Sequence, residues 1–173
     1  FKFSAHYTPA LEVGGDFYDF IHLGKNRIGI VIGDVSGKGV PAALYMAKLG
    51  SDMRTLAFTE STPAAALAKL NDLLAARSRR GMFATLLYAE LDAESGAIVV
   101  ANAGHLPPLI KKADGSFAKF PSAGGSPLGI LPGMKFAQDA MTLERGDTVI
   151  LYTDGIIEAM NAREELYGYE RLE

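Results

Sequence analysis

Apolar residues follow a strand-like pattern in the first part of the chain. Residues 16–23 and 27–35 are apolar-rich segments separated by Gly-Lys-Asn, which predicts a β-hairpin. The second segment is apolar at nearly every position, as in a strand that is covered on both faces. Residues 2–7 alternate loosely between apolar and polar, and they predict an edge or half-buried strand.

A helical pattern replaces the strand pattern from Pro41. Residues 41–58 are rich in helix-forming residues, although their apolar positions lie only partly on one face. A second helix is predicted over 63–80, because Thr62 is a good N-cap and proline is favoured in the first turn. Three arginines suit the end of this helix, where positive charge complements the helix dipole: Arg77, Arg79 and Arg80.

Strand patterns return after Gly81 and predict two more hairpins. Their arms are joined by short turns: 82–92 with 96–104, and 107–112 with 117–120. Two further strand-like segments follow, at 135–144 and 147–155. The order of the elements predicts an α+β fold of mostly antiparallel sheet, with helices packed on its outer faces. We interpret residues 1–173 as a single domain.

Composition narrows the class of protein. The 173 residues are 49% hydrophobic and 21% charged, with a formal net charge of −3, so the chain lacks the basic character of nucleic-acid binders. It contains no cysteine, which excludes thiolate chemistry and fits a cytoplasmic protein. No apolar run is long enough to span a membrane. Because the chain begins at Phe1 inside a strand-like pattern, we expect it to be a domain of a longer regulatory protein.

Three aspartates occupy the ends of apolar segments, where a buried core should end. Asp16 precedes one such segment, whereas Asp34 and Asp154 each follow one. In antiparallel neighbours the end of one strand lies beside the start of the next, so the three carboxylates can meet at one rim. Clustered carboxylates repel one another and lose hydration, and Lys38 can neutralise only one of them. Divalent cations are therefore the expected partners of these hard oxygen ligands.

A plainer interpretation exists for the same residues. Asp-Gly and Gly-Asp pairs are common in loops, so Asp34 and Asp154 could simply form turns. The glycines around Asp34 would let main-chain groups approach an ion or a phosphate, or would merely form a tight strand-to-helix connection: Gly33, Gly37 and Gly39. The position of all three aspartates beside apolar strands favours the metal site.

Six sequence blocks occur in order along nearly the whole chain. They are EVGGDFYDF (12–20), GDVSGKGVPAAL (33–44), FATLLYAELD (83–92), NAGHLPPLI (102–110), SPLGI (126–130) and GDTVILYTDGIIEA (146–159). Together they resemble the bacterial SpoIIE-type serine/threonine phosphatases, a branch of the metal-dependent type 2C superfamily. The resemblance implies two packed, mainly antiparallel sheets flanked by helices, with metals bound in a cleft at one rim.

The resemblance also implies a set of metal ligands. Asp34 would bridge two Mn²⁺ or Mg²⁺ ions, and the carbonyl oxygen of Val35 would bind one of them. Asp16 would serve the same site directly or through water, and Asp154 would hold the other metal. The family has a further metal-binding aspartate in a late D-D-x-T strand, but this chain stops at Glu173 before any such segment. We therefore expect an incomplete second metal site, weak metal affinity and poor activity for this fragment.

The function implied by the resemblance is hydrolysis of a phosphoserine or phosphothreonine in a bacterial regulatory protein, typically an anti-sigma-factor antagonist. Two metals would activate the attacking water, so no serine nucleophile is required. The alternative is a non-catalytic phosphoprotein-binding or partner-switching module, and a third possibility is activity on small phosphomonoesters. Retention of all three aspartates favours the enzyme. Neither nucleic acid nor membrane is expected as a partner of this domain, and the two helices offer a possible homodimer surface.

Other polar residues receive simpler interpretations. Ser36 stands where many eukaryotic relatives carry a histidine proton donor, and it is not expected to act as a nucleophile. Asp19 is expected to point away from the site, because three residues along a strand separate opposite faces. His105 is assigned a structural or substrate-edge role. Asp147 is expected to be a solvated loop acid.

Overall fold

Strands that follow one another in the sequence form two antiparallel sheets in the computed structural model, which describes residues 1–9, 13–77, 81–121 and 124–172. The larger sheet contains β1 (Phe17–His22), β2 (Arg27–Val35), β3 (Ala84–Asp92), β4 (Ala97–Ala103) and β7 (Gln138–Thr142), in the order β1-β2-β3-β4-β7. The smaller sheet contains β5 (Leu109–Lys111), β6 (Phe117–Lys119) and β8 (Thr148–Ile150), in the order β6-β5-β8. The predicted α+β class with two antiparallel sheets is confirmed.

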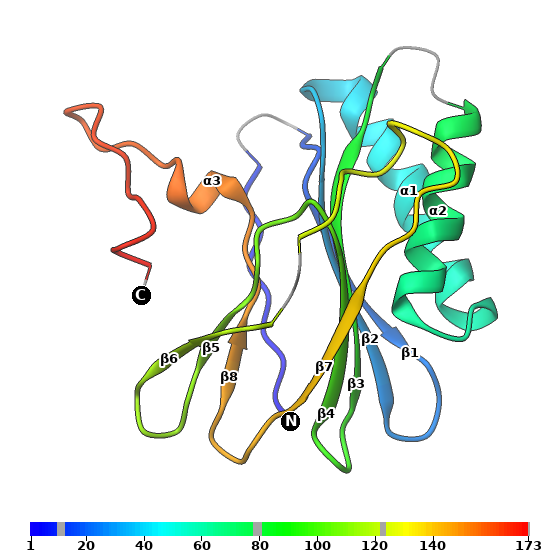
Figure 1. Cartoon of the computed structure of the whole chain (residues 1–173). Coiled ribbons are helices and arrows are strands. Elements are labelled where there is room, and N and C mark those ends of the chain that lie inside the picture. The colour runs from blue at the N-terminus through cyan, green and yellow to red at the C-terminus, as the bar shows by residue number, and fades with distance from the viewer. Residues whose placement is uncertain (10–12, 78–80, 122–123, 173) are drawn as a thin grey trace.

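Two long helices cover one face of the larger sheet. The helices α1 (Gly39–Thr59) and α2 (Pro63–Arg77) pack against the face that points away from the smaller sheet (Figure 1). A short helix, α3 (Asp154–Ile157), follows β8. Both long helices thus lie on one outer face of the two-sheet core. The sequence predicted helices on its outer faces without saying which face each helix covers. Among the described residues, no helix is both long and apolar enough to cross a membrane.

The larger sheet is buried on both faces. Leu86 of β3 packs in a cluster with the helices, while its neighbour Leu87 packs in a second cluster with Ile110 of the smaller sheet. In β2, the adjacent residues Val31 and Ile32 likewise belong to opposite clusters. Burial on both faces explains why β2 is apolar at almost every position, as the sequence predicted.

The start of α2 follows its sequence signal. The Thr62 hydroxyl accepts a hydrogen bond from the Ala65 amide at 3.2 Å, so the predicted N-cap is confirmed. Arg77, in the last turn, forms an ion pair with Asp52 of α1 at 2.9 Å. The other two arginines predicted at this helix end, Arg79 and Arg80, lie outside the described residues.

One strand prediction is wrong in the structure, and one strand pairing was left open by the sequence. Residues 2–7 belong to no strand, although several of their side chains lie against apolar residues of both sheets. The last two strand-like segments do not pair with each other: β7 pairs with β4 in the larger sheet, and β8 pairs with β5 in the smaller one. The chain crosses between the sheets here, and Leu143 in the crossover is buried in the apolar cluster between the layers.

Asp147 lies in this crossover and is not the solvated acid that the sequence suggested. Its side chain is 1% exposed and forms an ion pair with Lys112 at the end of β5. It also accepts a hydrogen bond from the Glu144 amide at 3.0 Å. These two contacts stabilise the charged carboxylate and hold the pKa of Asp147 below its usual range. This ion pair holds the turn that leads into β8 and towards Asp154.

Candidate metal centre

Strand register places Asp16 beside Asp34. Asp34 is the penultimate residue of β2, and β1 pairs with β2 so that Phe17 lies opposite Gly33. Asp16, one residue before Phe17, therefore reaches the position across from Asp34. The sequence argument that the start of one strand meets the end of its antiparallel neighbour thus describes this pair correctly.

The two carboxylates contact each other. Burial raises the pKa of Asp34 to about 7, with further contributions from a hydrogen bond to Asp16, the charge of Asp16 and the charge of Asp154. The Thr153 hydroxyl donates a hydrogen bond to Asp16 Oδ2 at 2.8 Å, which orients this carboxylate from the opposite side of the site. Burial and the adjoining acid both disfavour the charged form of Asp34, and a bound cation would favour it.

Asp154 occupies a different environment. It begins α3 and is exposed to solvent, although its charge is close enough to affect Asp34. All three aspartates line one open cleft of about 780 Å³, together with Lys38. Within the described ranges, no three His, Cys, Asp or Glu side chains converge tightly enough to hold a metal ion by themselves. The structure brings Asp16 and Asp34 into contact and leaves Asp154 at the border of the same cleft.

The main chain at Gly15 lies close to the Val35 carbonyl and to the Asp34 carboxylate. A Cβ atom at this position would lie 2.7 Å from the Val35 carbonyl oxygen and 3.3 Å from Asp34 Oδ1. Only glycine permits this approach without displacing the backbone. The Val35 carbonyl and the two carboxylates are hard oxygen donors. Mg²⁺ is commonly bound by one or two carboxylates and completes its shell with water or phosphate. The residues present therefore fit a divalent cation held by Asp16, Asp34 and the Val35 carbonyl.

The glycines after Asp34 serve the turn into α1. Gly37 and Gly39 have φ values of +103° and +69°, in the region that disfavours residues with a Cβ atom. A Cβ atom at either position would meet nothing within 4 Å. This geometry supports the plainer interpretation of these two glycines as a tight strand-to-helix connection.

Ser36 and Asp19 are engaged elsewhere. Ser36 Oγ accepts a hydrogen bond from the Phe83 amide at 3.0 Å, and the Ser36 amide donates to the Phe83 carbonyl at 2.9 Å. The hydroxyl thus joins two chain segments at the ends of β2 and β3. Asp19 accepts hydrogen bonds from Arg54 of α1 at 2.7 and 3.0 Å, as expected for a side chain that points away from the cleft.

Sequence reasoning missed three residues that contribute to the cleft. Thr153 orients Asp16, and Gly15 permits the close approach of the main chain. The Tyr7 side chain also lines the cleft, and its pKa is raised by burial and by the charges of Asp16 and Asp34. The Gly-Gly pair before Asp16 was a usable signal, because two glycines beside an acidic residue often mark a close backbone approach. No comparable signal pointed to Thr153 or Tyr7.

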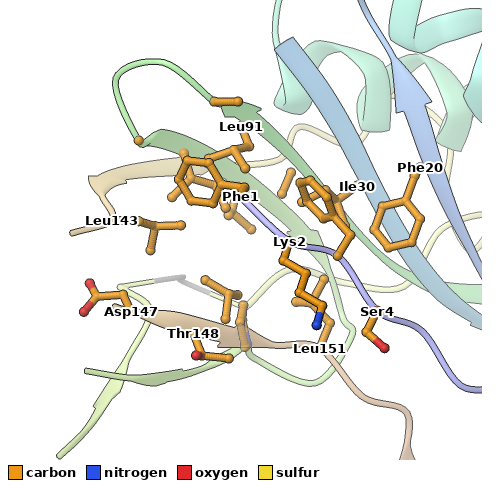
Figure 2. Close-up of a pocket in the computed structure, with 18 of the residues that line it drawn as sticks. Phe1, Lys2, Ser4, Phe20, Ile30, Leu91, Leu143, Asp147, Thr148 and Leu151 are labelled. Atoms are coloured by element: carbon orange, nitrogen blue, oxygen red, sulfur yellow. The ribbon is translucent and has the colours of Figure 1, made fainter. Parts of the chain in front are cut away.

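A larger pocket lies between the two sheets. It has a volume of about 870 Å³ and is lined mainly by apolar side chains, including Ile30, Leu91, Leu143 and Leu151 (Figure 2). The N-terminal residues run along it, and Figure 2 shows the Lys2 side chain within it. None of the three predicted aspartates lines this pocket. The smaller cleft is the candidate active site, because the convergent carboxylates are there.

Stability without metal should depend on pH through Asp34. The folded-state pKa of about 7 exceeds the value of 3.8 for an unperturbed aspartate, so the folded protein binds this proton more tightly than the unfolded chain. The stabilisation is complete below about pH 4 and is lost as the pH rises to about 7. Urea unfolding in EDTA should therefore show a falling free energy of unfolding across this range. Asp34→Asn should flatten this dependence; an equally steep fall in the variant would contradict the assignment.

Comparisons with known proteins agree with the fold and the motifs. Residues 24–173 match the family described as Stage II sporulation protein E (SpoIIE). Phosphoserine phosphatase RsbU of Bacillus subtilis is 35% identical over 87% of this chain and 45% of its own length. Protein IcfG of Synechocystis is 30% identical over 99% of this chain and 31% of its own length. The chain thus spans less than half the length of these curated relatives.

A solved structure has the same fold as this chain. The crystal structure of the RsbU and RsbW domains of Rv1364c from Mycobacterium tuberculosis superimposes with a TM-score of 0.77 at 34% sequence identity. The match covers 88% of this chain and 42% of that one. The arrangement of two antiparallel sheets with helices is therefore shared with a solved relative.

Proposed function

The chain belongs to the SpoIIE family, and from that premise we propose that it is a metal-dependent protein phosphatase. The substrate is a phosphoserine or phosphothreonine in a regulatory protein, and hydrolysis proceeds by attack of water without a covalent enzyme intermediate. The observation that carries the proposal is the contact between Asp16 and Asp34 in an open cleft, with a pKa near 7 for Asp34. Paired acids of this kind at a cleft are a signature of functional sites.

Each residue of the cleft has a separate role in this proposal. Asp34 and the Val35 carbonyl would hold Mn²⁺ or Mg²⁺, Asp16 would contribute to the same site, and Asp154 would hold a second ion. When bound, such cations lower the pKa of water and screen the charge of the phosphoryl oxygens. The Thr153 hydroxyl keeps Asp16 oriented towards Asp34.

Lys38 and the shape of the cleft act on the substrate. Lys38 lies at the cleft just before α1, and its positive charge attracts the phosphate dianion. The cleft is open to solvent, so a phosphorylated side chain on the surface of another protein can enter it. This openness favours a protein substrate.

The names of the relatives support the class of substrate. RsbU is named as a phosphoserine phosphatase, and the solved Rv1364c structure joins an RsbU domain to an RsbW domain. We propose by analogy that this chain dephosphorylates a regulatory phosphoprotein of the anti-sigma-factor antagonist class. This substrate class is proposed by analogy alone, because the chain spans only part of the length of these relatives.

One observation favours a second candidate function. Asp154 is exposed, and the described residues provide no set of three side-chain ligands for one ion. A domain with this incomplete set could bind a phosphoprotein without hydrolysing it. Such a non-catalytic module would retain the cleft and Lys38 but would release no phosphate.

Metal removal separates the two functions. We expect EDTA to abolish phosphate release from a phosphoserine protein and millimolar Mn²⁺ to restore it, because the carboxylates would hold the cation that supplies the activated water. Phosphate release and substrate binding are measured on the same samples, by a colorimetric assay and by calorimetry. Hydrolysis that persists in EDTA would contradict the metal-dependent mechanism. Binding without hydrolysis in Mn²⁺ would instead support the non-catalytic module.

A further inference from the structure

The loop 128–133 is held against α2 and β3 by hydrogen bonds. The Asn71 side chain of α2 is buried; it accepts a hydrogen bond from the Gly129 amide at 3.0 Å and donates one to the Leu131 carbonyl at 2.8 Å. The Asp72 carboxylate accepts a hydrogen bond from the last amide of the loop at 2.7 Å. The first residue of the loop exchanges two backbone hydrogen bonds with β3, at 2.8 and 3.2 Å. These contacts fix the backbone of the loop.

Large apolar side chains are exposed where this loop passes the start of α1. They are Val40 and Leu44 on the helix, and Ile130 and Leu131 on the loop. Each is between 51% and 67% exposed, and the two on the helix are one turn apart on the same face. The loop approaches α1 at Gly129, where a Cβ atom would lie 3.3 Å from the Tyr45 hydroxyl (Figure 1). We call these exposed residues of the helix and the loop the apolar patch.

Both halves of the apolar patch begin beside the candidate metal cleft. On α1, Val40 is two residues after Lys38, which lines the cleft and is the N-cap of the helix. On the loop, Leu128 bonds to Ala84 of β3, and Ala84 lies opposite Val35 in the register of β2 and β3. A protein whose phosphorylated residue lies in the cleft is therefore within reach of the apolar patch.

The charges around the apolar patch indicate which partner covers it. Exposed apolar side chains gathered in one place are typical of a protein interaction surface, because covering them is favourable. Residues 35–47 and 126–138 contain Lys38 and Lys135 but no acidic residue. In a symmetric dimer formed through the patch, two copies would bring these positive charges together, whereas a phosphoprotein brings a dianionic group. The phosphoprotein is therefore the better match.

We propose that the apolar patch is a docking surface for the phosphoprotein: it binds an apolar segment of that protein while the phosphorylated residue lies in the cleft. This inference rests on the proposed function and deepens it, since it identifies a surface that selects the substrate. The fixed backbone of the loop means that little order has to be gained on binding. A small phosphomonoester enters the cleft without reaching the patch, so it gains nothing from it.

Two fluorescent phosphoserine peptides of equal length and charge test the docking. One carries leucine and isoleucine on both sides of the phosphoserine, and the other carries serine and asparagine at the same positions. Ile130→Ser combined with Leu131→Ser removes the loop half of the apolar patch, and Leu44→Gln removes part of the helix half without a loss of helix propensity. Phe58→Gln is the matched control, because Phe58 is also exposed on α1 but lies at the other end of the helix.

Fluorescence anisotropy measures the affinity for each peptide, and phosphate release measures kcat/KM, in Mn²⁺ and with the whole 173-residue chain. We expect the wild type to prefer the apolar peptide about tenfold or more in both measurements, the effect of burying one leucine or isoleucine side chain. The loop variant and Leu44→Gln should lose most of this preference, and Phe58→Gln should keep it. All variants should hydrolyse free phosphoserine as the wild type does.

Equal affinity of the wild type for the two peptides would overturn the inference, as would a preference that both patch variants retain. Loss of free phosphoserine hydrolysis in these variants would also overturn it, because the apolar patch would then support the metal centre itself. A wild-type dimer that dissociates in the variants would show that a second copy covers the patch. A preference for the apolar peptide without any phosphate release would support docking and contradict the proposed hydrolysis, so the two failures are distinguishable.

Discussion

Asp34→Asn should abolish Mn²⁺-dependent phosphatase activity while making the metal-free protein more stable. A bound cation contributes several kcal/mol to stabilising the transition state, so its loss should lower the rate about 10³-fold or more. The neutral amide removes a partly buried charge that adjoins Asp16, which should raise the free energy of unfolding at pH 8 by on the order of 1 kcal/mol after allowance for solvent screening. Phosphate release and urea unfolding in EDTA measure the two effects.

Asp19→Asn is the matched control for this substitution. Asp19 lies three residues from Asp16 but pairs with Arg54 of α1 outside the cleft. Its substitution should leave Mn²⁺ affinity and phosphate release close to wild type, while weakening a surface ion pair. Equal activity of Asp34→Asn and the wild type would remove Asp34 from the mechanism. If metal-free Asp34→Asn is less stable than the wild type at pH 8, the ionised Asp34 carboxylate does not destabilise the folded protein.

Gly15→Ala should weaken Mn²⁺ binding by about tenfold or more, an effect comparable to the loss of a residue that orients a metal ligand. The new Cβ atom would lie 2.7 Å from the Val35 carbonyl oxygen, which is too close, so the backbone must shift. Because the carbonyl and Asp34 are proposed ligands, the shift should disturb the site directly. Overpacking of this kind also costs about 1–3 kcal/mol of stability. Calorimetric titration with Mn²⁺ and thermal unfolding measure the two effects.

Gly50→Ala provides the same chemical change at a site where it should help. Gly50 lies inside α1, and a Cβ atom there would lie 3.8 Å from the Phe17 ring, an ordinary contact. Alanine is favoured over glycine in a helix by about 1 kcal/mol, so this variant should be more stable and bind Mn²⁺ normally. Wild-type Mn²⁺ affinity in Gly15→Ala would contradict this account. It would show that the close contact between Gly15 and the Val35 carbonyl is not needed for metal binding.

The sequence predicted an element correctly where a local signal, such as a cap or a turn, and the pattern of buried apolar residues indicate the same element. The helix starting at Pro63 has both an N-cap and a first-turn proline, and the hairpin of β3 and β4 has a short turn between apolar arms. The same reasoning failed for residues 2–7, and it left open the pairing partners of β7 and β8. In both places the decisive contacts are made across the space between the two sheets, and no local pattern specifies which sheet a strand will join.

The candidate site was predictable to the extent that it depends on strand register. Asp16 and Asp34 meet because β1 and β2 form a hairpin, and a hairpin can be recognised in sequence. Asp154 follows a strand of the other sheet, so its distance from the pair depends on how the two sheets pack. The contribution of Thr153 arises from the same packing, so it could not be predicted from spacing along the chain.

The central claim is that Asp16, Asp34 and the Val35 carbonyl, which strand register brings together, would hold a divalent cation. Anomalous diffraction from crystals of the chain soaked in Mn²⁺ locates the ion directly. The account predicts a peak in the cleft, within about 2.0 to 2.6 Å of oxygen atoms from Asp34 and the Val35 carbonyl. Soaked crystals with no peak in the cleft, or with manganese bound away from Asp34, would contradict it.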